Sequence, residues 1–178
     1  RGIVGSSRYA INLREAIRQA SADPQARPVL ISGEPGLEKD NIAALIHYGS
    51  AARKLLLLRF NGALLRPDGA ELFESHAGAA PLLELLGAGG LLIDQLDRCP
   101  ALLRQRLLEL ARDGRWSAPT DPPGSSRRFG GRLFLTTEEN VPGFESVARA
   151  IRVPPLRVRR QDLGEWMRSE EHTSELQS

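Results

Sequence analysis

Residues 28–47 read PVLISGEPGLEKDNIAALIH, in which a short apolar run, a turn with two glycines and a helical pattern follow one another directly. The run at 28–32 is bounded by turn residues, which is typical of a strand buried in a parallel sheet. Gly33 to Gly36 interrupt this run, and the apolar spacing from Lys39 to His47 predicts a helix. A strand, a glycine-bearing turn and a helix in this order form the setting that a phosphate-binding loop requires.

Apolar runs alternate with helical patterns along the rest of the chain. Further strands are predicted at 55–60, 91–93 and 133–135, and further helices at 8–21 and 101–112. This alternation predicts an α/β fold, in which helices cover both faces of a parallel sheet. Residues 117–131 are predicted as a long loop, and Pro154 and Pro155 close the last αβ unit before a helical segment that starts at Arg157.

Composition places the chain among globular domains. It has 178 residues, 41% of them hydrophobic and 26% charged, which suffices for one domain with a core. No apolar run approaches the ~20 residues of a membrane span. The three histidines show no metal-ligand spacing. We therefore expect a cytoplasmic piece of a longer protein, with no membrane contact in this segment.

Cys99 is the only cysteine, which excludes an internal disulfide. We interpret it as a small buried residue, and a mildly activated thiol at a helix start is the alternative.

The charge pattern does not predict a nucleic-acid-binding surface. The formal net charge is +2, and all the basic residues except Lys39 and Lys54 are arginines. Because the arginines are spread along the chain, we interpret them as solvated faces and expect no direct DNA binding by this segment.

Residues 33–40, GEPGLEKD, carry most features of a phosphate-binding loop. Gly33, Gly36 and Lys39 fit, because glycines let backbone N–H groups surround phosphates and the lysine reaches the outer ones. Glu38 departs from the pattern, which has Gly directly before the Lys. A carboxylate ~4 Å from a phosphate costs on the order of 4 kcal/mol per charge pair before screening, against about −8 kcal/mol for a micromolar affinity. Taken alone, the loop has a second interpretation, a tight turn with Lys39 on a solvated helix start.

Six segments, in order across residues 2–163, resemble the central AAA+ domain of bacterial sigma-54-dependent transcriptional activators. They are IVGSS at 3–7, VLISGEPGLEKDNIAALIH at 29–47, RFNGALL at 59–65, ELFE at 71–74, GGLLIDQLDRCP at 89–100 and IRVPPLRVRRQDL at 151–163. The resemblance implies a P-loop NTPase core of three αβα layers and ATP with Mg²⁺ as cofactor. It also implies protein partners: copies of the chain in a ring, and sigma-54 RNA polymerase.

The resemblance assigns roles to individual residues. It places the nucleotide on Gly33, Glu34, Pro35, Gly36, Leu37, Glu38, Lys39, Asp40 and Asp94. Asp94 would also hold Mg²⁺. Gln95 stands in place of the glutamate that polarises the attacking water, and an amide is no base at neutral pH. Glu138 stands in place of an asparagine that senses the γ-phosphate. Arg149 and Arg152 are the nearest candidates for the family's arginine fingers.

The segment between ELF at 71–73 and Gly89 is shorter than in the family and has no G-A-F-T-G-A loop, which contacts sigma-54 there. Together with the changes at 38, 95 and 138, this suggests a degenerate domain. Such a domain would bind nucleotide weakly, hydrolyse it poorly or not at all, fail to engage sigma-54, and act as a regulatory or interaction module. Two alternatives stay open: a competent ATPase that activates sigma-54 RNA polymerase, and a purely structural domain without nucleotide.

The predicted domain boundaries follow from the same comparison. Residues 1–155 form the AAA+ core and 156–167 the start of a truncated helical lid. Residues 168–178 read RSEEHTSELQS and resemble, codon for codon, the translation of a sequencing-library adapter. We interpret this last segment as foreign to the protein and exclude it from the fold prediction.

Overall fold

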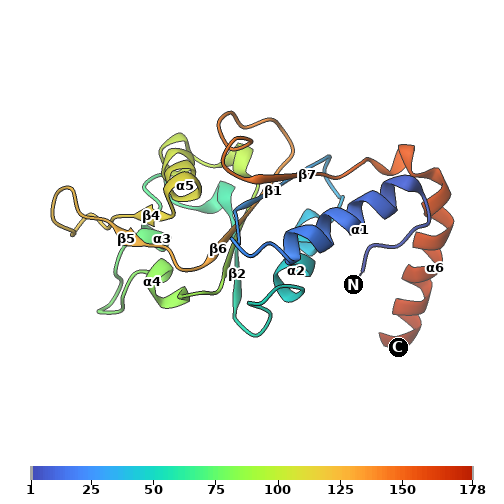
Figure 1. Cartoon of the computed structure of the whole chain (residues 1–178), viewed down its shortest axis with the longest axis horizontal. Coiled ribbons are helices and arrows are strands. Elements are labelled where there is room, and N and C mark those ends of the chain that lie inside the picture. The colour runs from blue at the N-terminus through green and yellow to red at the C-terminus, as the bar shows by residue number, and fades with distance from the viewer. Residues whose placement is uncertain (1, 178) are drawn as a thin grey trace.

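A five-stranded, wholly parallel sheet forms the centre of the molecule (Figure 1). The computed structural model describes residues 2–177, apart from the side chains of Trp166 and residues 170–177. The strand order is β2-β3-β6-β1-β7, with bounds β1 Val29–Ser32, β2 Leu57–Asn61, β3 Gly90–Asp94, β6 Arg132–Thr137 and β7 Arg149–Arg152. The sheet confirms the predicted α/β class.

Helices cover both faces of this sheet. On one face lie α1 (Arg8–Ser21) and α2 (Lys39–Tyr48), and on the other α3 (Ala70–Phe73), α4 (Leu82–Leu86) and α5 (Ala101–Asp113). Alternation along β1 divides the core, since Val29 and Ile31 pack with α1 and α2 whereas Leu30 packs with α5. Each fully buried side chain of this size stabilises the fold by about 1.5–3 kcal/mol.

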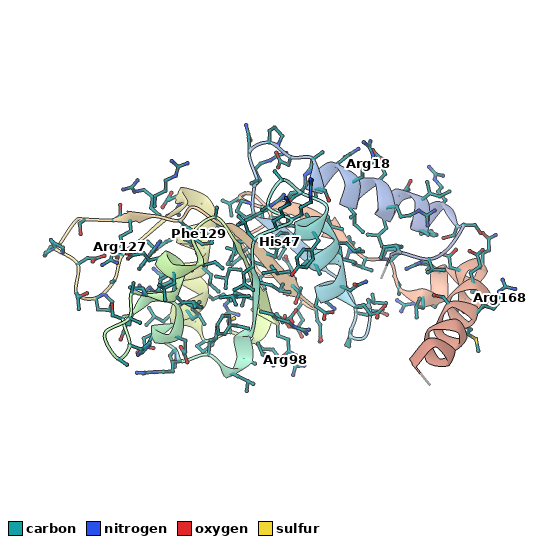
Figure 2. All side chains as sticks on the ribbon, turned by 90° about the horizontal axis from the view of Figure 1, so that it is seen from below. Arg18, His47, Arg98, Arg127, Phe129 and Arg168 are labelled. Carbon is teal, nitrogen blue, oxygen red and sulfur yellow. The ribbon has the colours of Figure 1, made fainter. Side chains whose placement is uncertain are left out.

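The predicted loop at 117–131 is partly paired. Within it, β5 (Arg127–Arg128) forms a short antiparallel ribbon with β4 (Arg115–Trp116), which directly precedes the predicted loop. Asp121 in the loop forms an ion pair with Arg127. The ribbon and the C-terminal helix α6 (Arg160–Gln177) lie at opposite ends of the molecule, as the positions of Arg127 and Arg168 show (Figure 2).

Three short 3₁₀ turns complete the path of the chain: η1 Gly62–Leu64, η2 Leu96–Arg98 and η3 Leu156–Val158. Helix α6 runs through the predicted boundary at 167/168 without a break. Within residues 2–177, no helix combines the length and apolar character needed to span a membrane.

The first and last predicted motifs meet in a buried cluster that we call the Ser7–Asp162 clamp. It comprises Gly5, Ser7, Arg159 and Asp162. The backbone N–H of Ser7 donates to Asp162 Oδ1 at 2.8 Å, its hydroxyl donates to Oδ2, and Arg159 Nε donates to Oδ2 at 3.0 Å. Asp162 is only 1% exposed. Gly5 has φ +130°, and a Cβ there would lie 2.3 Å from the Asp162 carboxyl carbon, so the clamp requires glycine. The Ser7 hydroxyl also caps α1 by accepting from Ala10 N.

Cys99 is buried as predicted, and we expect its thiol to be unreactive in the folded chain. Burial raises its pKa from 9.0 to about 11, and Sγ lies directly over Gly62. A thiol reagent at pH 8 should react about 100-fold more slowly with the native chain than with the urea-unfolded chain. Because Cys99 is the only thiol, the absorbance of the released chromophore reports on it alone. Equal rates in both states would contradict this prediction.

Candidate functional site

A cleft of about 350 Å³ lies at the carboxyl ends of the parallel strands, which is where open α/β sheets bind ligands. Its lining comes from the loop between β1 and α2 and from the ends of β2, β3 and β6: Pro35, Gly36, Leu37, Glu38, Lys39, Asp40, Arg59, Asn61, Asp94, Gln95, Thr136 and Glu138. The fold thus brings together nine of the residues named from the sequence. Gly33 and Glu34 lie at the base of the same loop and line a neighbouring cavity with Arg157.

The loop at 33–38 has the shape of an anion site. Gly36 adopts φ +76°, and Glu38, directly before α2, adopts the left-handed conformation at φ +52° and ψ +42°. This backbone suits glycine, and a residue with a side chain adopts it at a cost of about 1–2 kcal/mol. The first intrahelical bond of α2 runs from Ile42 N to Glu38 O, so the amides of Lys39 and Asp40 precede the first intrahelical bond. Such amides attract negative charge.

Lys39 folds back onto the loop that carries it. Its Nζ donates to the carbonyl oxygens of Gly33 at 2.8 Å and Glu34 at 2.7 Å. The ammonium group therefore stabilises the loop backbone. The Glu34 carboxylate turns to Arg157, with which it forms an ion pair at 2.5 Å.

Asp94 and Gln95 follow one another at the end of β3, and Thr136 on β6 holds both. The Thr136 hydroxyl donates to Asp94 Oδ1 at 2.8 Å and accepts from Gln95 N at 3.2 Å. Gln95 adopts a left-handed backbone with φ +57°. The side chain directly after Asp94 is thus the amide of Gln95. An amide neither removes nor donates a proton in acid–base catalysis at neutral pH.

Arg59 bridges two carboxylates of the cleft, and the sequence analysis missed it. Its Nη1 donates to Asp40 Oδ2 at 2.6 Å, and its Nε donates to Asp94 Oδ2 at 2.5 Å. The parallel register sets Asn61, two residues on, beside Asp94, which brings the end of β2 next to β3. In the sequence, the feature that could have identified Arg59 is its charge near the carboxyl end of the strand predicted at 55–60.

The residues present do not fit Mg²⁺ as the resemblance implied. Mg²⁺ requires oxygen ligands at 2.0–2.1 Å in octahedral geometry. The two Asp94 oxygens accept from Thr136 and Arg59, and Asp40 accepts from Arg59 as well. Across the described part of the chain, no group of three or more His, Cys, Asp or Glu side chains is arranged to hold a metal ion.

Glu138 closes the far side of the cleft. Its backbone N–H donates to Asp97 Oδ1 at 3.2 Å, and its carboxylate lies 3.8 Å from Arg98 Nη2. The cleft is thus lined by four carboxylates, Glu38, Asp40, Asp94 and Glu138, and by two cations, Lys39 and Arg59. In this lining the carboxylates therefore outnumber the cations.

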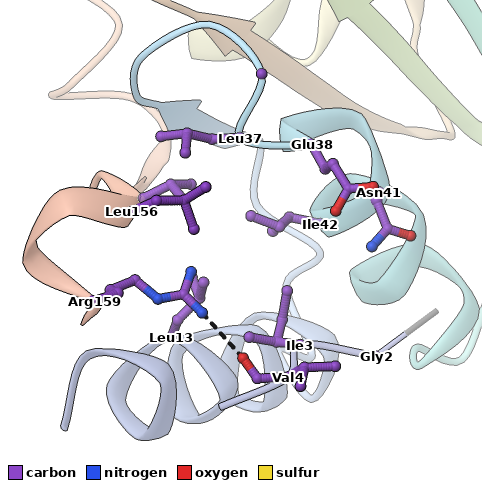
Figure 3. Close-up of a pocket in the computed structure, with 12 residues that line it drawn as sticks. Gly2, Ile3, Val4, Leu13, Leu37, Glu38, Asn41, Ile42, Leu156 and Arg159 are labelled. Atoms are coloured by element: carbon purple, nitrogen blue, oxygen red, sulfur yellow. Dashed lines mark hydrogen bonds between the residues drawn. The ribbon is translucent and has the colours of Figure 1, made fainter. Parts of the chain in front are cut away.

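A smaller pocket of about 50 Å³ lies on the other side of the loop (Figure 3). Ile3 and Val4 form its floor, and Leu156 and Arg159 form its outer wall. Arg159 Nη2 donates to the Val4 carbonyl at 3.1 Å across it. The pocket holds a few water molecules at most. Sequence reasoning did not identify it, because its walls come from opposite ends of the chain.

Together, the parallel sheet, the glycine-bearing loop between β1 and α2 and the helices on both faces define a P-loop NTPase fold of the AAA+ type. Residues 3–118 match the family described as the Sigma-54 interaction domain, and the chain belongs to this family. The resemblance stated from the sequence is therefore confirmed.

Relatives and solved structures agree with this assignment. The chain is 28% identical over 176 residues to the HTH-type transcriptional regulatory protein TyrR of Enterobacter agglomerans, covering 85% of this chain and 33% of TyrR. It is 29% identical over 174 residues to the Psp operon transcriptional activator of Escherichia coli, covering 84% of this chain and 52% of that protein. The chain thus spans between a third and about half of the length of these relatives.

Among solved structures, NtrX from Brucella abortus in complex with ATP matches with a TM-score of 0.73 and 23% identity. The match covers 91% of this chain and 39% of NtrX. A structure of NtrX in complex with ADP matches equally well. At this level of identity the likeness establishes the fold.

Proposed function

We propose that this Sigma-54 interaction domain is degenerate: it binds ATP weakly, does not hydrolyse it at a useful rate, and acts as a regulatory or interaction module in a longer transcriptional regulator. The observation that carries the proposal is the amide side chain of Gln95 directly after Asp94. Gln95 follows Asp94 at the cleft, where a P-loop ATPase of this family needs a carboxylate to polarise water, and its amide supplies no base.

Two further features support weak nucleotide binding. The Glu38 carboxylate stands at the start of α2, where phosphate oxygens would gather, and like charges repel there. Lys39 is engaged by two loop carbonyls. The loop is therefore built as an anion cradle but carries its own negative charge.

The segment between α3 and β3 supports the absence of sigma-54 engagement. Ala79 N donates to His76 O at 2.9 Å, which closes a tight turn, and α4 follows directly after Pro81. Leu83 of α4 anchors this segment in the core, and the turn at residues 75–79 is exposed but short. We expect it to offer no extended loop to a partner.

Phosphate release from ATP by the whole chain, with Mg²⁺ and with and without sigma-54, tests the proposal. We expect turnover equal to that of Lys39→Ala, which serves as the blank because it removes the phosphate-loop lysine. We also expect no co-elution with sigma-54. Turnover in the unsubstituted chain that Lys39→Ala abolishes would contradict the proposal and favour the competent ATPase.

A further inference from the structure

The guanidinium of Arg59 lies between the two carboxylates that a divalent cation would need. We propose that Arg59 is a built-in cation of this cleft, which takes the place of the metal ion and makes the cleft independent of Mg²⁺. The inference rests on the proposed function in one respect only, because both treat the cleft as the nucleotide-binding cleft of a P-loop fold. It concerns the charge of the empty cleft and requires no bound nucleotide.

The charges in the cleft require a cation at this point. Asp94 is buried at the end of β3, and its side chain is only 12% exposed. Thr136 donates a neutral hydrogen bond to one of its oxygens, which leaves the negative charge without compensation from β6. Arg59 supplies that compensation to the other oxygen. A buried carboxylate that lost this partner would be strongly disfavoured.

The second contact of Arg59 gives the bridge its position. Asp40 lies in the first turn of α2, directly after the loop lysine, and receives Arg59 Nη1 at 2.6 Å. One guanidinium thus connects β2, β3 and α2 at the mouth of the cleft. Its planar fork suits two carboxylates at once. Arg59 is exposed in both pairs, but Asp94 is more buried than Asp40, at 12% against 36% exposed, so the pair with Asp94 contributes the larger share.

A divalent ion cannot enter this arrangement without displacing Arg59. The ion would compete with Arg59 for Asp40 Oδ2 and Asp94 Oδ2, and it would meet the positive charge of the guanidinium at close range. Removal of the guanidinium reverses both conditions, because the Asp40 and Asp94 oxygens that accepted from Arg59 then lose their shared cation. Arg59→Ala should therefore create the divalent-cation site that the unsubstituted chain lacks.

The test is a Mn²⁺ titration of the whole chain without nucleotide, in which electron paramagnetic resonance measures the concentration of free Mn²⁺. We expect Arg59→Ala to bind Mn²⁺ at least about tenfold more tightly than the unsubstituted chain. Asp94→Asn added to Arg59→Ala should abolish the gain. Arg66→Ala is the matched control, because Arg66 is equally exposed and pairs with Asp68 outside the cleft. Its Mn²⁺ binding should equal that of the unsubstituted chain.

A second measurement needs no substitution at Arg59. We expect the thermal midpoint of the unsubstituted chain to be the same in Mg²⁺ and in EDTA, because a ligand that does not bind the folded state does not stabilise it. The inference is overturned if the unsubstituted chain binds Mn²⁺ as tightly as Arg59→Ala. It is also overturned if Mg²⁺ raises the midpoint and Asp94→Asn removes that rise. Neither outcome depends on ATP turnover, which tests the proposed function separately.

Discussion

Replacing Asp162 by Ala is expected to lower the free energy of unfolding by about 3 kcal/mol, and the thermal midpoint by about 6–12 °C. The substitution removes the acceptor for both donors of Ser7 and leaves the buried guanidinium of Arg159 without its carboxylate. A buried donor or charge that loses its partner still carries the free-energy cost of its removal from water, and no hydrogen bond then offsets that cost. Urea unfolding of the whole chain measures the loss.

Asp113→Ala is the matched control for this prediction. Asp113 also pairs with an arginine, but both partners are about half exposed, so we expect almost no change in stability. A loss below about 1 kcal/mol for Asp162→Ala would show that the Ser7–Asp162 clamp is dispensable.

The pH dependence of the clamp has a definite sign. Burial by itself would raise the pKa of Asp162, but the hydrogen bonds from Ser7 and the ion pair with Arg159 hold it below the ordinary value of 3.8. The stabilisation is therefore complete above about pH 4 to 5 and is lost as the pH falls through the lower pKa of the folded state. The difference in stability between the unsubstituted chain and Asp162→Ala should shrink over that range.

Replacing Glu38 by Gly is expected to tighten ATP binding by about two orders of magnitude, measured by calorimetry on the whole chain. The substitution removes the carboxylate at the start of α2 and places glycine in a left-handed conformation that suits it. The expected gain is smaller than the unscreened charge repulsion, because Glu38 is exposed and salt weakens its field. By the inference about Arg59, affinities measured in Mg²⁺ and in EDTA should agree.

Two further variants separate charge from backbone conformation. Glu38→Gln keeps a side chain in the left-handed conformation and removes only the charge, so we expect it to show most of the gain. Ala26→Gly is the matched control, since Ala26 also has a positive φ but lies away from the cleft. It should leave ATP binding unchanged. Micromolar binding by the unsubstituted chain would contradict the electrostatic argument.

Much of the fold could be predicted from the sequence because its central strands are fully buried. Runs such as 28–32 and 91–93 carry a strong apolar signal, and the helices at 8–21 and 101–112 carry a clear period. Strand β7 was missed because it lies at the sheet edge, where only Ile151 is buried. The β4–β5 ribbon was missed because strands of two residues have no period.

The candidate site was predictable only where local pattern determines it. The loop residues 33–40 are contiguous, and Asp94 follows a buried strand, so both could be placed at one edge of the sheet. Arg59 could not, because its role depends on the register of β2 against β3 and on the reach of a long side chain. The left-handed backbone at Glu38 had one signal in the sequence, namely the glycine that the phosphate-loop pattern places there.

The Ser7–Asp162 clamp also bears on the rate at which the fold is lost. Its partners are 155 residues apart, so they meet only after the sheet has brought both ends of the chain together. We expect a contact of this kind to form after the transition state for folding, so that its loss accelerates unfolding without slowing folding. In Asp162→Ala the missing stability should therefore appear almost wholly in the unfolding rate. We thus expect the clamp to set how long the domain stays folded and to leave the speed at which it forms unchanged.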